Sequence, residues 1–480
     1  MNSLLTELPV LLIVIPLAGV PLLYFTTRSG RGTALPALAV ILVVVTLLSF
    51  SIRDAMHAPV VTAAGGWQPD LGIGLQFDLL AVAAMLVTSL IVAQAILSHD
   101  ETSGAQHFRT LLMLLYAGSN GLMLTQDLFN AYVFIEITSI ASYALVASRQ
   151  DKGGFESAFK YVVMGSFAGL LVLWGIAGLY LTTGTLDMQS LAPRFDAAQG
   201  AVPALSAAAI IAGLLIKLGQ VPFHAWKADS LSGASYTVSA LLSGVTTTAF
   251  FVLLLRVLSA LPSLTLSLAP VLTTIASLSI ITGHLMALRQ PRYSRLLAYS
   301  SVAHIGYGLL AVSSGAVTAI AAGLFHILVH AIMKSSLFFL GRSFLHTGNR
   351  SDRLEAIVFP EQYRKLHVTL YVLLAMSMIG IPPVLGFTSK WYAVLETARA
   401  GYHTGAVLIA LGGAVALVYY LRVGIQLVHP GLPELSSPGP ASRRLPVPLA
   451  GTALILLLAV FSDRLLAFCV QAVVQLLEAV

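Results

Sequence analysis

The chain has 480 residues, of which 57% are hydrophobic and only 10% are charged, and its mean hydropathy is +0.88. Soluble domains carry about 25% charged residues, so this composition excludes a soluble globular protein. The formal net charge of +6 does not indicate a nucleic-acid partner, because the basic residues gather in the short loops between apolar runs.

Apolar runs of about 20 residues, the length that crosses a bilayer as a helix, recur along the whole chain. The first has no basic segment before it and exceeds the apolar core of a signal peptide, so we expect a permanent span. The pattern predicts an all-α polytopic membrane protein with about fourteen transmembrane helices. They are expected near residues 4–25, 34–52, 77–97, 109–126, 128–147, 158–182, 203–219, 235–260, 268–288, 295–314, 317–345, 366–385, 404–428 and 446–465.

The basic residues are unevenly shared between the two sides that these spans define. The loops after odd-numbered spans, with their flanking span ends, hold 18 of the 26 Lys and Arg residues, and the other side holds 5. Cytoplasmic loops carry the excess of Lys and Arg. We therefore expect a multi-pass protein of the cell membrane with both chain ends on the non-cytoplasmic side.

The seventh and twelfth expected spans each combine a lysine with a proline break. Lys217 precedes Pro222 in the seventh, and residues 380–383 (Gly-Ile-Pro-Pro) precede Lys390 in the twelfth. An ammonium at membrane depth costs about 2.5–3.5 kcal/mol on insertion scales, and it is tolerated where it faces protein or a wet cavity. Broken helices are tolerated in the same places. We therefore expect the broken helices 7 and 12 to line an ion pathway.

The two breaks lie five spans apart, which predicts an internal repeat. A repeat of five helices must be inverted relative to the membrane, because five is odd. The expected organisation is an N-terminal three-helix segment at 1–108, a first inverted repeat (helices 4–8) at 109–260, a second (helices 9–13) at 268–428, and helix 14 with a tail at 429–480.

The fifth expected span carries a carboxylate at mid-depth, Glu136. Ser139 and Tyr143 follow three and seven residues later, on the same helical face. A carboxylate beside a lysine stays charged, so pairing with Lys217 is the simplest arrangement. This pair either takes part in proton transfer or is a static ion pair that holds two helices together.

The eleventh span presents His326, His330 and Lys334 on one face, at intervals of four residues, and His304 lies in the tenth. Histidine titrates near neutral pH and can relay protons. Structural hydrogen bonding and a metal site remain as alternatives. No third ligand is evident, and Cys469 is the only cysteine, so we expect no metal or cofactor.

Together these groups form a string of titratable side chains that could move protons within the membrane plane. The sequence assigns no role to a further histidine, His284. The members of the string are Glu136, Lys217, His304, His326, His330, Lys334 and Lys390.

Four motifs in this order resemble the antiporter-like subunits of membrane complexes. They are residues 128–136 (Leu-Phe-Asn-Ala-Tyr-Val-Phe-Ile-Glu), 217–226 (Lys-Leu-Gly-Gln-Val-Pro-Phe-His-Ala-Trp), 238–244 (Val-Ser-Ala-Leu-Leu-Ser-Gly) and 380–390. That family includes the D subunit of Mrp-type cation/proton antiporters and the proton-pumping subunits of respiratory complex I and of membrane-bound group 4 hydrogenases. The resemblance covers about residues 70–430, and the chain looks most like the Mrp D or hydrogenase type.

The resemblance implies fourteen spans with two inverted five-helix repeats. It implies that Glu136 and Lys217 form the ion pair of a first half-channel and that Lys390 is the exit-side lysine of a second. It also implies that His304 and the polar face of the eleventh span lie on a central hydrophilic axis. Subunits of this kind work inside larger membrane assemblies and bind no redox cofactor.

One position departs from the family pattern. Thr248 stands where a lysine that links the two half-channels is expected. A threonine hydroxyl can order water but cannot hold a proton charge. Either waters held by Thr246, Thr247 and Thr248 bridge the gap, or only one half conducts.

Three functions are consistent with these features. The first is a subunit that exchanges protons for Na⁺ or another monovalent cation, and the second is a proton-pumping subunit driven by a redox partner. The third is a membrane scaffold that conducts nothing. The chain itself carries no catalytic chemistry, so the energy source would reside in other integral membrane subunits, and the sequence does not separate the first two.

Overall fold

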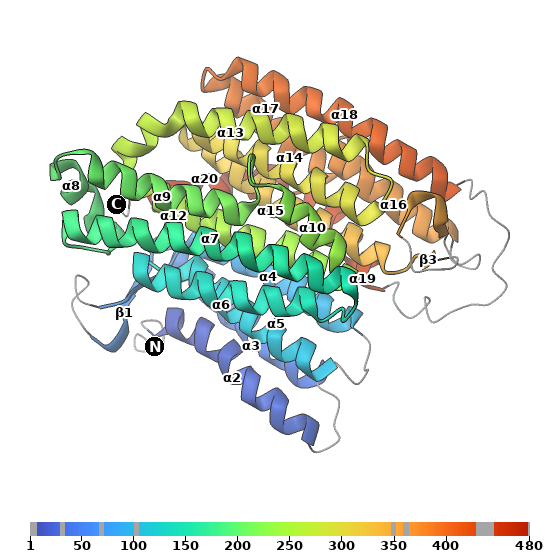
Figure 1. The fold of residues 1–480 in the computed structure, drawn as a ribbon, viewed down its shortest axis with the longest axis horizontal. Helices are drawn as coiled ribbons and strands as arrows, with labels where there is room; N and C mark the ends of the chain where they lie inside the picture. Colours follow the sequence, from blue (N-terminus) through green and yellow to red (C-terminus); the bar gives the residue numbers. More distant parts are fainter. Residues whose placement is uncertain are drawn as a thin grey trace. The chain divides into compact units, whose positions relative to one another are not determined.

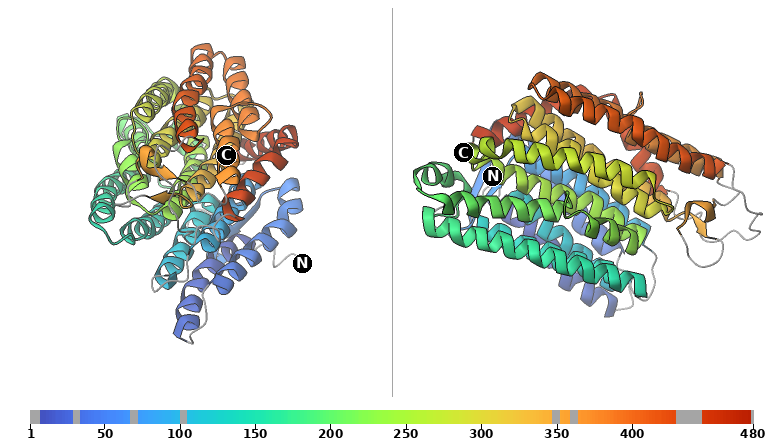
Figure 2. Two further views of the ribbon diagram at one scale, coloured as in Figure 1. Left: turned by 90° about the vertical axis from the view of Figure 1, so that its right-hand side faces the viewer. Right: turned by 45° about the horizontal axis from the view of Figure 1, so that its top comes forward.

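A computed structural model describes residues 7–28, 34–66, 72–99, 105–346, 352–358, 364–428 and 446–478, nearly all of them in helices (Figure 1). Contacts between residues divide the chain into two units. The first unit comprises Met1–Gly219, Val245–Ala269 and Phe468–Val480, and the second comprises Gln220–Gly244 and Pro270–Ala467. The axes of the long helices within each unit are roughly aligned with one another (Figure 2).

The first unit combines long helices with one β-hairpin. Strands β1 (Val60–Ala63) and β2 (Gly74–Phe77) pair in antiparallel register, with Val60 opposite Phe77. Aspartate side chains cap several helix N-termini, as that of Asp127 does by accepting a hydrogen bond from the backbone N–H of Asn130 at 2.6 Å. The elements are α2 (Leu8–Arg28), α3 (Ala34–His57), β1 (Val60–Ala63), η1 (Ala64–Gly66), β2 (Gly74–Phe77), α4 (Leu79–Ser98), α5 (Ala105–Leu124), α6 (Leu128–Ala147), α7 (Lys152–Thr183), α8 (Met188–Ala197), α9 (Ala201–Leu218) and α12 (Thr247–Ser259).

The second unit is built around α14 (Tyr293–Ser313) and α15 (Val317–Gly341), whose residues are almost all buried. Three elements pass from one unit into the other: η2 (Leu242–Thr246), α13 (Pro262–Leu288) and α20 (Ser462–Glu478). The remaining elements are α10 (Ala225–Gly233), α11 (Tyr236–Leu241), α14 (Tyr293–Ser313), α15 (Val317–Gly341), β3 (Leu345–His346), η3 (Leu354–Ala356), β4 (Ile357–Val358), α16 (Arg364–Ile379), α17 (Leu385–Arg399), α18 (His403–Val428) and α19 (Pro446–Ala459).

The expected helical membrane protein is confirmed. Within the described ranges, eleven helices are long and apolar enough to cross a membrane, or twelve if the bent pair α19 and α20 is one span. The span expected at 446–465 is bent and not continuous, because α19 ends at Ala459 and α20 starts at Ser462 at 86° to it. The spans expected near 109–126 and 366–385 correspond to α5 and α16, which lie outside the eleven. The count of fourteen stays a prediction.

Both lysine-bearing segments leave helical geometry close to the lysine. Helix α9 ends at Leu218, and Gly219 follows with a φ of 70°. Helix α16 ends at Ile379, and Gly380 follows with a φ of 89°. Glycine adopts positive φ without the steric cost that a Cβ imposes, so it can end a helix abruptly. Lys217 thereby lies in the last turn of α9, and Lys390 lies in the second turn of α17.

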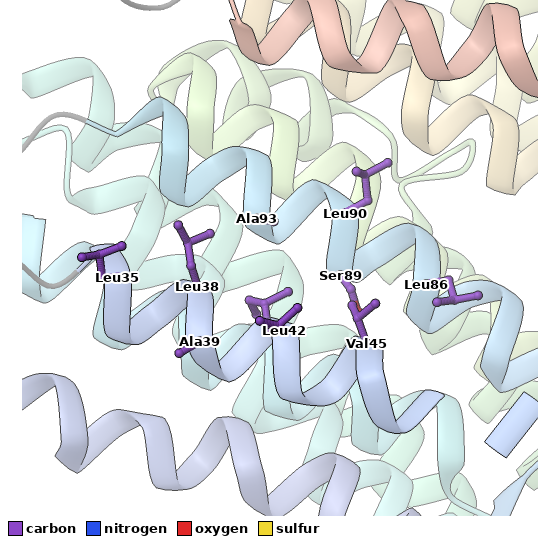
Figure 3. Close-up of a pocket in the computed structure, with 10 residues that line it drawn as sticks. Leu35, Leu38, Ala39, Leu42, Val45, Leu86, Ser89, Leu90 and Ala93 are labelled. Carbon is purple, nitrogen blue, oxygen red and sulfur yellow. The ribbon is translucent and has the colours of Figure 1, made fainter. Parts of the chain in front are cut away.

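An apolar groove of about 600 Å³ runs between α3 and α4 in the first unit (Figure 3). Its walls include Leu38, Leu42, Leu86 and Leu90. The one hydroxyl in its lining, that of Ser89, already donates to the Met85 carbonyl oxygen at 2.5 Å. The groove therefore suits apolar chains and offers no free group to an ion.

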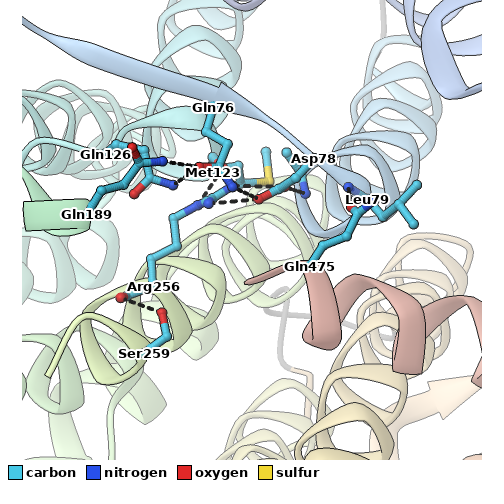
Figure 4. Close-up of polar contacts among 10 residues, drawn as sticks. Gln76, Asp78, Leu79, Met123, Gln126, Gln189, Arg256, Ser259 and Gln475 are labelled. Carbon is cyan, nitrogen blue, oxygen red and sulfur yellow. Dashed lines mark hydrogen bonds and ion pairs between the residues drawn. The ribbon is translucent and has the colours of Figure 1, made fainter. Parts of the chain in front are cut away.

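A fully buried ion pair, which no sequence motif indicates, also lies in the first unit. The guanidinium of Arg256 in α12 contacts the carboxylate of Asp78, with both side chains at 0% exposure (Figure 4). The two bonds are 2.9 Å and 3.0 Å long, and Arg256 also donates to the Met123 carbonyl oxygen. The Gln76 side chain donates to Asp78 and accepts from Gln126. This network joins the hairpin to α4, α5 and α12.

Candidate functional site

In the first unit, Lys217 reaches from α9 to the polar face of α6. The lysine side chain is buried, and its Nζ donates to the Ser139 hydroxyl at 2.7 Å and to the Tyr143 hydroxyl at 3.5 Å. Ser139 and Tyr143 are four residues apart, so both lie on one side of α6. Neither partner is charged, and the ammonium is therefore held by hydroxyl dipoles.

Glu136 lies one turn before Ser139 on the same helix, and it faces α7. Its Oε1 is 2.5 Å from the point where a Cβ on Gly169 would lie, and the Tyr143 hydroxyl is 1.8 Å from the equivalent point on Gly165. These two glycines let α6 and α7 approach closely. Among the described residues no ion pair joins Glu136 to Lys217, which differs from the expected direct pairing. The lysine meets α6 one turn further along, at Ser139.

In the second unit, Lys334 of α15 has a complete set of hydrogen-bond acceptors. Its Nζ donates to the Ser300 hydroxyl at 2.9 Å, to the Tyr420 hydroxyl at 3.2 Å and to the Leu297 carbonyl oxygen at 3.2 Å. An ammonium has three N–H donors, so none is left over. The side chain is fully buried, and none of its partners is acidic.

Lys390 is held by the broken helix itself. Its Nζ donates to the carbonyl oxygens of Met378 at 3.0 Å and Ile379 at 2.8 Å, both in the last turn of α16. Carbonyls at a helix C-terminus lack helical partners and carry partial negative charge, which stabilises a cation. The same ammonium lies 5.3 Å from the centre of the Tyr307 ring. The helix break thus supplies the counter-charge that an acidic side chain would otherwise provide.

Two of the predicted histidines form a directed hydrogen-bonded chain. His326 Nδ1 lies 3.2 Å from the Ser389 hydroxyl, and His304 Nδ1 lies 3.1 Å from His326 Nε2. When the Ser389 hydroxyl donates to the Gly386 carbonyl oxygen, at 3.1 Å, it accepts from His326 Nδ1–H. His326 Nε2 then accepts from His304 Nδ1–H, which leaves His304 Nε2 as an open acceptor.

The third histidine, His330, is stacked on His304 with ring centres 5.4 Å apart. Both of its ring nitrogens, and Nε2 of His304, are buried without a protein partner. A buried polar atom left unpaired costs about 1–3 kcal/mol, so these three nitrogens favour hydrogen bonds from internal water. Within the described residues, no three His, Cys, Asp or Glu side chains are placed to hold a metal ion.

The structure therefore gathers the predicted residues into two separate groups. In the first unit, Lys217 lies with the α6 face that carries Glu136, and Thr246, Thr247 and Thr248 are buried where η2 meets α12. In the second unit, one cluster contains all the others: His304, His326, His330, Lys334 and Lys390.

Sequence reasoning missed the hydroxyl groups that hydrogen-bond to the lysines and histidines of the second unit or lie against them. A tyrosine in an apolar helix looks like a core residue, because its ring is apolar and only its tip is polar. The spacing within one helix also gives no information on which tip meets which lysine across helices. The residues missed are Ser300, Tyr307, Ser389, Tyr419 and Tyr420, and His284 belongs to the same group.

Known proteins share this architecture. A curated relative, NADH-quinone oxidoreductase subunit N of Desulforudis audaxviator, is 34% identical over 462 residues, covering 92% of this chain and 90% of the relative. A chain in the structure of the membrane-bound sulfane sulfur reductase, an archaeal respiratory membrane complex, superposes with a TM-score of 0.90 at 26% identity over 98% of both chains. A chain of the Mrp complex from Dietzia gives a TM-score of 0.87 at 23% identity over 99% of this chain and 98% of that one, a likeness of fold alone.

The family described as NADH:quinone oxidoreductase/Mrp antiporter, transmembrane, matches residues 125–416, which include both lysine-bearing breaks and every predicted titratable residue. This confirms the resemblance identified from the four motifs. The chain belongs to this family and is an antiporter-like membrane subunit of the complex I and Mrp type.

Proposed function

We propose that this chain is the proton-translocating membrane subunit of a redox-driven respiratory complex. The observation that carries the proposal is the pair of buried lysines in the second unit, Lys334 and Lys390, neither of which has an acidic partner. Ionisable groups at membrane depth are costly and mark ion or proton pathways. The likeness to subunit N of an NADH-quinone oxidoreductase supports the redox-driven form.

The two ammonium groups can drive each other's discharge. Like charges in a poorly screened interior repel, so a proton that arrives on one lysine favours release from the other. The directed chain from His304 through His326 to Ser389 leads toward Lys390, the next residue of α17. For a proton to pass on, the Ser389 hydroxyl takes one from His326 Nδ1–H, turns away from the Gly386 carbonyl oxygen, and gives its own proton through water to an uncharged Lys390. The unpaired Nε2 of His304 and the unpaired ring nitrogens of His330 are the uptake end of this chain.

In the first unit, Lys217 is proposed as a separate loading site. Ser139 and Tyr143 hold it without a counter-charge, and Glu136 lies one turn away on the same face. Movement of the lysine head toward Glu136 would stabilise its charged form, and return to Ser139 would favour release of a proton. The three threonines, Thr246–Thr248, are proposed to order water.

We further propose the topology expected from the sequence: fourteen helices, two inverted five-helix repeats interrupted at helices 7 and 12, and both termini on the non-cytoplasmic side. The excess of basic residues in alternate loops supports this orientation. Some of those residues, Arg31, Arg350, Arg443 and Arg444, lie outside the described ranges.

The second candidate is an Mrp-type antiporter subunit, in which a gradient of Na⁺ or another monovalent cation drives the same proton relay. The geometry of the proton relay suits this function equally well, because it is the same whichever source of energy drives the protons. A non-conducting scaffold is the third, and it predicts that no buried lysine matters for transport.

The native complex, purified through a tag on this chain and reconstituted into vesicles, separates these functions. Proton movement that starts on addition of an electron donor and a quinone supports the redox-driven proposal. Proton movement that needs only an imposed Na⁺ gradient overturns it in favour of the antiporter. The subunits that copurify provide a second reading, because redox centres are found only in the first case.

A further inference from the structure

A second set of hydrogen bonds connects the neighbourhoods of Lys334 and Lys390, and the histidine chain does not use it. The Lys334 ammonium donates to Ser300, and the Tyr419 hydroxyl donates to Ser300 at 3.2 Å. The Tyr419 hydroxyl is also 3.3 Å from His284 Nδ1. His284 Nε2 is 2.5 Å from the hydroxyl of Tyr307, whose ring lies against the Lys390 ammonium.

We propose that His284 is a proton-relay residue in a tyrosine branch (Tyr307, His284, Tyr419 and Ser300) that runs in parallel with the histidine branch (His304, His326 and Ser389). This inference rests on the proposed proton translocation and adds a route and its direction. Every member of the tyrosine branch is buried, and α13, α14 and α18 supply them.

The hydrogen bonds orient the tyrosine branch. Ser300 accepts from Lys334 and from Tyr419, which fills both of its lone pairs, so it donates its own proton to Tyr420 at 3.0 Å. Because Tyr419 donates to Ser300, it accepts from His284 Nδ1–H. His284 Nε2 is then an acceptor, and the Tyr307 hydroxyl donates to it.

This orientation sets the order in which protons move along the branch, and each residue that gains a proton gives up another. A proton that reaches the Tyr307 oxygen from Lys390, by rotation of the lysine or through one water, releases the Tyr307 proton to His284 Nε2. His284 Nδ1–H then passes its proton to Tyr419, and Tyr419 passes one to Ser300. When Lys334 is uncharged it has two N–H donors and a lone pair, so the Ser300 hydroxyl turns from Tyr420 to that lone pair and passes its own proton to Lys334. One proton enters and one leaves.

As drawn by these hydrogen bonds, the tyrosine branch points from Lys390 to Lys334 and the histidine branch points toward Lys390. The histidine branch begins at His304 and at His330, which lies one helical turn from Lys334. Each branch carries protons in the other sense once its imidazoles and hydroxyls have turned over, so either branch can connect the two lysines when the other is blocked.

The hydrogen bond between His284 and Tyr307 fits only because the facing residue of α18 is a glycine. A Cβ on Gly412 of α18 would lie 2.1 Å from the Tyr307 hydroxyl and 2.7 Å from His284 Nε2. Gly412 is therefore the positioning residue of the His284–Tyr307 bond. Gly424, on the same helix, offers a matched control, because its nearest neighbour is an ordinary contact at 3.6 Å on Tyr371.

The test measures proton pumping by the native complex in reconstituted vesicles. We expect Tyr419→Phe to slow pumping by about threefold, because the histidine branch still conducts, and His326→Gln to do the same. The double variant is expected to lose more than about thirtyfold, well beyond the product of the single losses. Tyr371→Phe removes another buried hydroxyl, one that donates to the Tyr420 carbonyl oxygen outside the branch, and it controls for packing.

Pumping by Gly412→Ala provides a second test, with an expected result that a general packing defect would not give. It is expected to match Tyr419→Phe and to add nothing in a Tyr419→Phe background, whereas Gly424→Ala leaves pumping unchanged. A Tyr419→Phe loss no larger than that of Tyr371→Phe, a double loss equal to the product of the singles, or complete loss from Tyr419→Phe alone overturns the parallel branch. Should Lys390→Ala still pump at the parent rate, the proposed translocation itself fails, which is a different result.

Discussion

The Lys390 ammonium donates a hydrogen bond of 2.8 Å to the carbonyl oxygen of Ile379, the last residue of α16. The helix break after Ile379 therefore supplies a hydrogen-bond acceptor for the lysine that lies eleven residues later. An unbroken helix would use that carbonyl internally and leave a buried ammonium without an acceptor. A proton carrier needs a charge that is stabilised but not fixed, and carbonyl dipoles provide this without the permanent partner that a carboxylate would be.

Replacing Lys390 by alanine is expected to reduce proton pumping to background while the complex still assembles. The variant removes the carrier and leaves the helix break intact. Pumping by reconstituted vesicles, read with a pH-sensitive dye, checks this, with the recovered subunits as the measure of assembly. Lys365→Ala, at an exposed lysine near the start of α16, should pump like the parent protein. Full activity of Lys390→Ala would remove this residue from the pathway.

Glu136→Ala is expected to abolish proton-coupled transport as well, because it removes the carboxylate near Lys217. Ser139→Ala is expected to have a smaller effect, since Lys217 keeps its contact with Tyr143. The loss of one hydrogen bond to a charged group corresponds to about 1.5–3 kcal/mol, or roughly ten- to a hundredfold in the occupancy of the Ser139-bound position. Transport that is equal in Glu136→Ala and the parent protein would leave Glu136 a structural residue.

The sequence predicted the helical membrane fold, both helix breaks and the lysines beside them, because each of these features depends on residues that are close together in the chain. Twenty apolar residues need a helix, and a glycine followed by prolines ends one. The sequence did not predict that α19 and α20 form a bent pair, because the apolar run continues past Ala459 and only packing decides where it turns.

The residues that contact each other across helices could not be predicted from the sequence alone, because helix packing decides these contacts as well. The expectation that Lys217 pairs with Glu136 used the only nearby opposite charge, yet the lysine meets Ser139, one turn away. His284 received no role because its meaning depends on Tyr307 and Tyr419, which lie 23 and 135 residues away. Periodicity fixes the face of a helix, and it does not fix the neighbour that this face meets.

Gly169→Ala is expected to impair transport although it adds only one methyl group. The new Cβ would lie 2.5 Å from Glu136 Oε1 and would push the carboxylate away from its present position or separate α6 from α7. Gly153→Ala, near the start of the same helix, is the matched control, because its Cβ would meet Asp151 at an ordinary 3.7 Å. Pumping is measured for both at equal assembly. The idea fails if the two variants pump equally well.

Breaking the buried pair of Arg256 and Asp78 is expected to destabilise the first unit without touching the relay. Removing one partner of a buried ion pair leaves an uncompensated charge and costs about 3–5 kcal/mol. Arg256→Met should therefore lower the thermal unfolding midpoint of the purified complex, and Arg256→Met with Asp78→Leu should recover part of the loss, because no charge is then left unpaired. Lys160→Met breaks an exposed pair with Glu156 and is expected to change the midpoint little. If Arg256→Met unfolds no earlier than Lys160→Met, the network in Figure 4 contributes little to the stability of this unit.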